Sequence, residues 1–126
     1  MEHTSSNVVR EKSKAFAIRT IRFVRYLQTE KKDFVLSNQI LRSGTSIGAN
    51  VRESKNAQSI ADFINKLSIA LKEADETLYW LELLFESDTI DETIFNSLYN
   101  DVKELIALLT SIIKTTKNNN KPKHWE

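Results

Sequence analysis

Apolar side chains recur at helical spacing in four successive stretches of the chain. We expect helices at about residues 8–29, 34–56, 59–86 and 90–116, each with one apolar and one polar side. No stretch alternates apolar and polar residues with a period of two, so no sheet is expected. The expected core positions are Val9, Phe16, Phe23, Val24, Leu27, Leu36, Ile40, Ile47, Val51, Ile60, Phe63, Ile64, Leu67, Leu71, Ala74, Leu78, Leu81, Phe85, Phe95, Leu98, Val102, Leu105, Leu109 and Ile112.

Four amphipathic helices with short connections predict an all-α fold, an antiparallel up-down-up-down four-helix bundle. The chain has 126 residues, of which 40% are apolar, enough to build the core of a single domain. We place this domain at residues 1–117 and interpret residues 118–126 as a flexible polar tail. The fourth helix is expected to begin at a capping box, in which Thr89 caps the helix and Glu92 bonds back to it.

Two glycines, Gly44 and Gly48, lie within the second stretch without interrupting its apolar periodicity. Each destabilises a helix interior by about 1 kcal/mol relative to alanine. Because they are four residues apart, they share a face, where the lack of a Cβ would let a neighbouring helix approach closely. The alternative is a phosphate-binding loop, but that loop needs a lysine and a preceding strand that this segment does not offer.

The third stretch carries a second stripe beside its core stripe. Its members are Phe63, Lys66, Ala70, Glu73, Thr77, Trp80 and Leu84. A stripe that combines an aromatic pair, Tyr79 and Trp80, with charged groups fits a subunit interface. The alternative is that both rings lie on the edge of the bundle, half exposed to water.

Charge is balanced over the whole chain but not along it. The chain has 18 Lys and Arg against 17 Asp and Glu, so composition alone predicts neither a nucleic-acid nor a membrane partner. Residues 10–32 have eight basic and two acidic residues, a net +6, whereas the third stretch has six acidic and two basic residues, a net −4. The basic face of the first helix, with Lys14, Arg19, Arg22 and Arg25, is a candidate for contact with RNA or DNA phosphates. Alternatively it is solvated, or pairs with the acidic third helix of the same or a neighbouring subunit.

Several kinds of chemistry are excluded or disfavoured by composition. With 0 Cys there is no disulfide, Cys–zinc site, iron–sulfur cluster or thiol nucleophile. The two histidines, His3 and His124, fall in the predicted flexible ends, so a catalytic triad or a His-based metal site in the bundle is not expected. Glu73 and Glu76 lack the histidine that di-iron bundles use, and we expect Glu76 to pair with Lys72 instead. We therefore expect no enzyme activity, no cofactor and no metal.

The N-terminus has no apolar signal-peptide run, and no apolar stretch reaches the roughly 20 residues that span a bilayer. We therefore expect a cytoplasmic protein with no membrane partner.

Two segments resemble a known family. Residues 37–53 read SNQILRSGTSIGANVRE and residues 62–81 read DFINKLSIALKEADETLYWL. They resemble the two signatures of a bacterial four-helix-bundle family named after intervening sequences of large-subunit ribosomal RNA. The resemblance implies an up-down bundle, a homopentameric ring and no established enzymatic activity. In a related branch, the accessory protein of diversity-generating retroelements, a strongly basic pentamer binds nucleic acid and a reverse transcriptase; this chain departs from it in its balanced charge and acidic third helix.

The resemblance marks the motif positions Gln39, Arg42, Ser46, Asn50, Glu53, Lys66, Glu73, Glu76, Tyr79 and Trp80. All except Gln39 and Ser46 are our candidates for a subunit interface or polar network. Our hypothesis is that Arg42, Lys66 and Glu73 share a partly buried network, in which an unpaired charge would cost about 3–5 kcal/mol. The expected function is a non-enzymatic, ring-forming scaffold whose partners are copies of itself and a protein or nucleic acid. The alternative is an accessory protein that binds RNA or DNA through the first helix.

Overall fold

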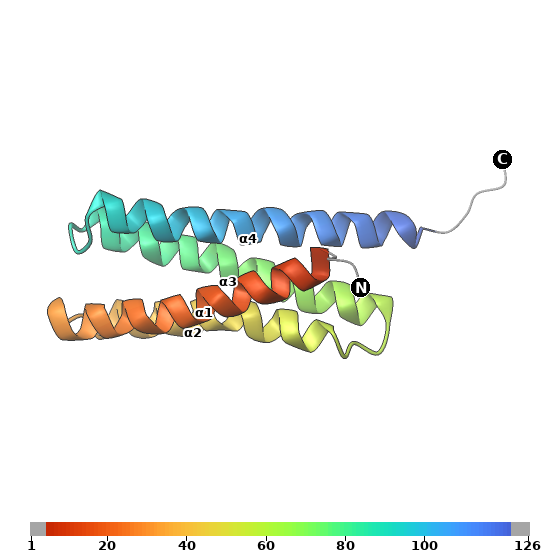
Figure 1. Cartoon of the computed structure of the whole chain (residues 1–126), viewed down its shortest axis with the longest axis horizontal. Coiled ribbons are helices and arrows are strands. Elements are labelled where there is room, and N and C mark those ends of the chain that lie inside the picture. The colour runs from red at the N-terminus through yellow and green to blue at the C-terminus, as the bar shows by residue number, and fades with distance from the viewer. Residues whose placement is uncertain (1–4, 122–126) are drawn as a thin grey trace.

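The computed structural model describes residues 5–121, which form four α-helices and no strand. These are α1 (Ser5–Glu30), α2 (Val35–Ser54), α3 (Ile60–Glu86) and α4 (Glu92–Asn119). Successive helices run in opposite directions (Figure 1), so the predicted all-α up-down bundle is confirmed. The predicted helix bounds agree to within three residues, and α4 continues two residues into the predicted tail. Residues 122–126 of that tail, with His124, and residues 1–4, with His3, lie outside the described residues.

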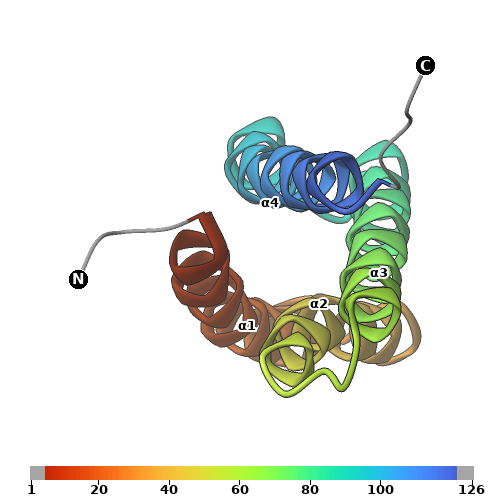
Figure 2. The same cartoon turned by 90° about the vertical axis from the view of Figure 1, so that its right-hand side faces the viewer.

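The helices form a circuit in which each packs against its neighbours in sequence, and α1 also meets α4 (Figure 2). Of the four neighbouring pairs, α1 and α4 pack least closely, and Figure 2 shows these two helices set further apart than the other pairs. Within residues 5–121, α1 does not pack against α3, nor α2 against α4. The basic first helix and the acidic third helix therefore lie diagonally, so their opposite charges are not paired within one chain.

The core follows the predicted apolar stripes. Leu27, Ile47, Leu81 and Leu109 have no exposed surface, and most of the other expected core positions are buried or half-buried. Ile60 was predicted to be in the core but is 48% exposed, because it is the first residue of α3 at the end of the bundle. In the part of the chain that the structure describes, no helix has the length and apolar character needed to cross a bilayer.

The two stripes of α3 have a simple origin, because α3 packs against α2 on one side and α4 on the other. Ala70, Thr77 and Leu84, all from the second stripe, are completely buried within the single chain. Most of this stripe therefore needs no second subunit to cover it. Its two charged residues, Lys66 and Glu73, together with Trp80, stay partly exposed along the α2–α3 edge.

The glycines of α2 bring it close to α1, as the sequence predicts. A Cβ at Gly44 would lie 2.8 Å from both Cγ2 and Oγ1 of Thr20, and one at Gly48 would lie 3.2 Å from the carbonyl oxygen of Ser13. Both contacts are on α1, so the glycine face of α2 is the surface on which these two helices pack.

The start of α4 differs from the prediction. The cap is Asp91, whose Oδ1 accepts a hydrogen bond from the Ile94 N–H at 2.8 Å. Thr89 is not the cap, because it still belongs to the turn that follows α3. The N–H groups of Thr89 and Ile90 both donate to the carbonyl oxygen of Leu84, so the helix begins two residues later than predicted.

Candidate functional site

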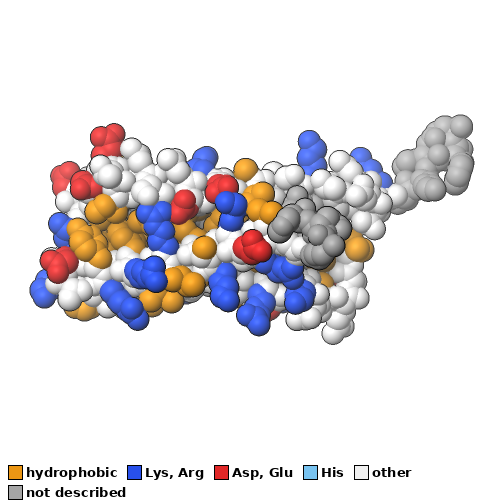
Figure 3. Space-filling view, in the orientation of Figure 1, with side chains coloured by type: hydrophobic (Ala, Val, Ile, Leu, Met, Phe, Trp, Pro, Cys, Tyr) orange, Lys and Arg blue, Asp and Glu red, His pale blue; other side chains and the backbone are white. Residues whose placement is uncertain are grey.

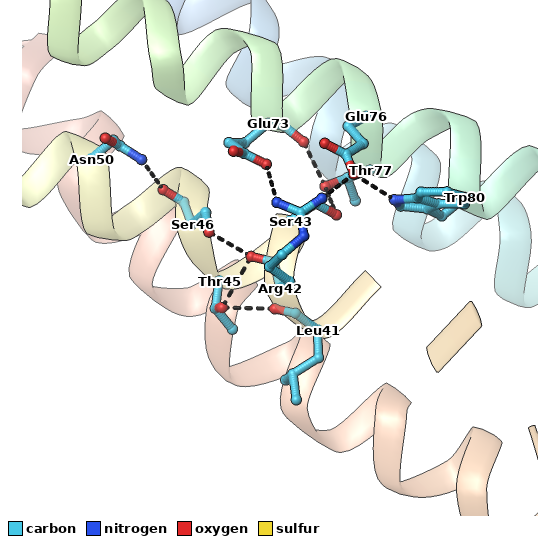
Figure 4. Close-up of polar contacts among 10 residues, drawn as sticks. All are labelled: Leu41, Arg42, Ser43, Thr45, Ser46, Asn50, Glu73, Glu76, Thr77 and Trp80. Carbon is cyan, nitrogen blue, oxygen red and sulfur yellow. Dashed lines mark hydrogen bonds and ion pairs between the residues drawn. The ribbon is translucent and has the colours of Figure 1, made fainter. Parts of the chain in front are cut away.

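A charged network joins α2 to α3 at the surface of the bundle (Figure 4). Arg42 Nη1 donates to Glu73 Oε1 at 3.1 Å, and Arg42 Nη2 donates to Glu76 Oε2. The same Glu76 oxygen accepts a hydrogen bond from the indole Nε1–H of Trp80 at 3.1 Å. One guanidinium from α2 therefore clamps two carboxylates on successive turns of α3, and one of them orients Trp80.

The network is less buried than the sequence-based hypothesis assumed. The side chain of Arg42 is 49% exposed, that of Glu76 34% and that of Glu73 20%. Ion pairs with this access to water contribute about 1 kcal/mol or less each. The expected cost of about 3–5 kcal/mol for an unpaired buried charge therefore does not apply here.

Lys66 is not part of this network, contrary to the prediction. Its Nζ lies 3.2 Å from Oε1 of Glu53, and the two form a separate pair between α3 and α2. Lys66 and Glu73 are two helical turns apart, about 10 Å along the axis, so Lys66 pairs with a different carboxylate from those that Arg42 binds. The other candidate on α2, Asn50, donates from its side-chain amide to the Ser46 carbonyl oxygen at 2.9 Å, so its hydrogen bond stays within the helix.

A buried layer lies beneath the charged one. Thr77 Oγ1 is 2.9 Å from Ser43 Oγ on α2 and 2.8 Å from the carbonyl oxygen of Glu73 (Figure 4). Both hydroxyl side chains are fully buried. Because a buried hydroxyl must be hydrogen-bonded, this contact fixes the register in which Arg42 meets its two carboxylates.

Tyr79, which is exposed, and Trp80, which is half-buried, form an aromatic pair beside the network. Their ring centroids are 5.2 Å apart at an interplanar angle of 57°, and Tyr79 is 53% exposed. Trp80 is held by its bond to Glu76, whereas Tyr79 projects into solvent. An anchored ring next to an exposed ring offers apolar contact area that is already ordered before anything binds.

The basic face of α1 keeps three of its four predicted residues open. Arg19 is occupied, because Nη1 lies 2.5 Å from Asp101 Oδ2 on α4 and Nη2 donates to Ser97 Oγ. Lys14, Arg22 and Arg25 make no ion pair with any residue of 5–121. Figure 3 shows Lys and Arg side chains over this face, beside an apolar strip along the boundary with α4.

Sequence reasoning missed a groove of about 380 Å³ between α1 and α2. Its lining residues are Arg10, Lys14, Ala17, Thr45, Gly48, Ala49, Arg52 and Lys55. Arg10 was counted in the net charge of residues 10–32 but not placed on the basic face with Lys14, and Arg52 and Lys55 were not connected with that face. The glycine face of α2 is the sequence signal that could have identified this groove. When that face packs on α1, the cations at the end of α2 come close to those near the start of α1.

One titratable group on the opposite side of the bundle is perturbed. The Tyr99 hydroxyl on α4 donates to Glu82 Oε2 on α3 at 3.2 Å. Burial, followed by this hydrogen bond and the negative charge of Glu82, raises the pKa of Tyr99 above its ordinary value. Among residues 5–121, no group of three or more His, Cys, Asp or Glu side chains is placed to hold a metal ion.

Comparison with known proteins gives a family and a structure. A family described as 23S rRNA-intervening sequence protein matches residues 5–111. A crystal structure of a protein with unknown function from the S23 ribosomal protein family of Bacteroides thetaiotaomicron is similar, with a TM-score of 0.87 and 57% sequence identity. The similarity covers 88% of this chain and 99% of that one. No curated protein matches the chain. The chain belongs to the 23S rRNA-intervening sequence protein family.

Proposed function

We propose that this protein is a non-catalytic scaffold that assembles with copies of itself into a ring, a homopentamer. The observation that carries the proposal is the aromatic pair beside the Arg42 network, in which exposed Tyr79 lies against half-buried Trp80 and Trp80 is bonded to Glu76. Aromatic rings surrounded by arginine and other charged groups are typical of the energetic centres of interfaces. The ring size of five rests on the family resemblance.

Charge distribution supports a ring over a symmetric pair. Basic α1 and acidic α3 lie diagonally in the bundle and cannot neutralise each other within a chain. Contact between α3 of one copy and α1 of the next would pair them and use two different surfaces. Such a head-to-tail interface closes into a ring when the rotation is suitable. On the α1 side, a surface groove of about 680 Å³ contains the 43% exposed Ile18 and the open Arg22, and it offers a receiving surface.

Light scattering after size-exclusion chromatography tests the proposal. Five copies of the 14.5 kDa chain give about 72 kDa, the mass we expect for the full chain. Tyr79→Ser should lower this mass toward that of one chain. Ile60→Ser is the matched control, because Ile60 is 48% exposed on the same helix but lies at its far end. A wild-type mass of 14.5 kDa, or equal losses for the two variants, would contradict the proposal.

A second candidate, binding of RNA or DNA, is favoured by one observation: Lys14, Arg22 and Arg25 on α1 have no carboxylate partner among residues 5–121. Phosphate binding weakens steeply as salt rises, whereas assembly through apolar surface does not. A nucleic-acid absorbance signal that copurifies at low salt and is lost at high salt would support this candidate. The Arg22→Gln/Arg25→Gln variant should then lose that signal.

A further inference from the structure

The boundaries between neighbouring helices, here called seams, differ in how their charged side chains are paired. The α1–α4 and α2–α3 seams each pair cations with carboxylates across the helices. The cross-helix ion pairs are Lys12–Glu104, Arg19–Asp101, Arg42–Glu73, Arg42–Glu76 and Lys66–Glu53. The groove between α1 and α2 has cations on both sides, and none of the carboxylates that the structure describes lines it.

The groove itself is compact and cationic on both walls. Arg10 and Lys14 line it from α1, and Arg52 and Lys55 line it from the end of α2. Figure 3 shows Lys and Arg side chains gathered over this part of the molecule. The groove is lined elsewhere by small side chains, and Gly48 lets α2 approach the α1 backbone so that the two walls converge. A volume of about 380 Å³ lies in the range of small-molecule sites.

No carboxylate of residues 5–121 neutralises any of these four cations. Within residues 5–121, none of them forms an ion pair, and Arg10 donates only to the side-chain oxygen of Asn7. Arg10 and Lys14 are also four residues apart on one helix, a spacing at which like charges repel. A multiply charged anion in the groove would relieve this repulsion and gain charge-assisted hydrogen bonds.

We propose that the α1–α2 groove binds a compact polyanion with two or more adjacent phosphates, of the class of nucleoside di- and triphosphates. The phosphates lie among Arg10, Lys14, Arg52 and Lys55, and the uncharged part lies along the small residues of the groove. The cationic segment extends only about 6 Å along α1, from residue 10 to residue 14, which matches a few linked phosphates and not a long strand. This site does not depend on self-assembly, and it shares only Lys14 with the second candidate function.

Calorimetric titration of the full chain with pyrophosphate, and separately with ATP, tests this site. We expect saturable binding with one equivalent per chain. Lys14→Gln/Arg52→Gln removes one cation from each wall and should weaken binding by at least about tenfold. Arg22→Gln/Arg25→Gln removes the same charge from α1 outside the groove and should change the affinity by less than about twofold.

A second pair of variants separates charge from folding. Ala49 is exposed and lines the groove, so Ala49→Glu places a carboxylate there while Ala49→Gln adds the same bulk without charge. Ala49→Glu should abolish binding, and Ala49→Gln should weaken it far less. Equal losses for the two double variants, or no binding of either probe by the wild type, would overturn the proposal. A single-stranded RNA that binds when pyrophosphate and ATP do not would also overturn it, in favour of a strand on the α1 face.

Discussion

The two sides of α2 pack against their neighbouring helices with different kinds of residues. Toward α3, α2 presents Arg42 and Ser43, which meet two carboxylates and a buried hydroxyl. Toward α1, it presents two glycines and, near its end, cations that face further cations. The first seam is complete within the chain, because its polar groups are satisfied. In the second, no carboxylate of residues 5–121 pairs with the cations, and this difference indicates which helix pair can receive an anionic ligand.

The largest expected effect concerns the glycine packing. Gly44→Ala gains about 1 kcal/mol of helix propensity, but its Cβ would lie 2.8 Å from two atoms of the buried Thr20 side chain. Thr20 cannot move easily, because its Oγ1 donates to the Phe16 carbonyl oxygen at 2.8 Å. We expect a net loss of about 2 kcal/mol in the free energy of unfolding, measured in urea at fixed chain concentration.

The matched test of this packing uses a Thr20→Ala background, which removes both of the atoms that clash. There, Gly44→Ala should be neutral or stabilising. An equal loss in the two backgrounds would show that close approach to Thr20 is not the reason for the glycine.

Next in size is the loss of the paired seam. Arg42→Gln removes both ion pairs and leaves Glu73 and Glu76 facing each other without a cation. We expect a loss of about 1 kcal/mol in the free energy of unfolding, a figure that allows for the exposure of Arg42. Lys66→Gln removes only the ion pair with Glu53 and should lower the free energy of unfolding by roughly a few tenths of a kcal/mol. Both losses should shrink in high salt, and a salt-independent loss for Arg42→Gln would contradict an electrostatic role.

A third seam, α3–α4, gives a pH-dependent test. Tyr99→Phe removes the hydrogen bond to Glu82 and should cost about 0.5–1 kcal/mol near neutral pH. The folded-state pKa of Tyr99 is raised above the ordinary 10.0, so its contribution is fully present below pH 10 and is lost as pH rises through the folded value. Between about pH 9 and pH 11, the free energy of unfolding should therefore fall more for the wild type than for Tyr99→Phe. Parallel curves for the two proteins would contradict this origin.

The smallest expected effect has the opposite sign. Lys14→Gln relieves the repulsion from Arg10 and should raise the free energy of unfolding by about 0.2–0.5 kcal/mol at low salt. The gain should vanish in high salt or when pyrophosphate is added to both proteins. A destabilisation like that of Arg42→Gln would mean that the charge of Lys14 is already compensated.

The fold could be predicted from the sequence because apolar periodicity alone decides which faces are buried. Periodicity could not say which neighbour covers a face, so the second stripe of α3 was attributed to a subunit interface although α2 covers Thr77. The Arg42 and Glu73 contact came from the family resemblance, and the position of Lys66 was wrong because its contact depends on the register between helices. The groove escaped prediction for the same reason, since Lys14 and Arg52 line one groove only because Gly48 lies against α1.

The most direct test of the contrast between the two sides of α2 is an NMR spectrum that contains the amide signals of the two glycines. The chain has only 2 glycines, so nitrogen-15 glycine labelling gives one amide signal for Gly48, which lines the groove, and one for Gly44, which does not. On titration with pyrophosphate, we predict a saturable shift of the Gly48 signal with little change at Gly44. No shift at Gly48, or equal shifts of both signals, would contradict an anion site in the α1–α2 groove.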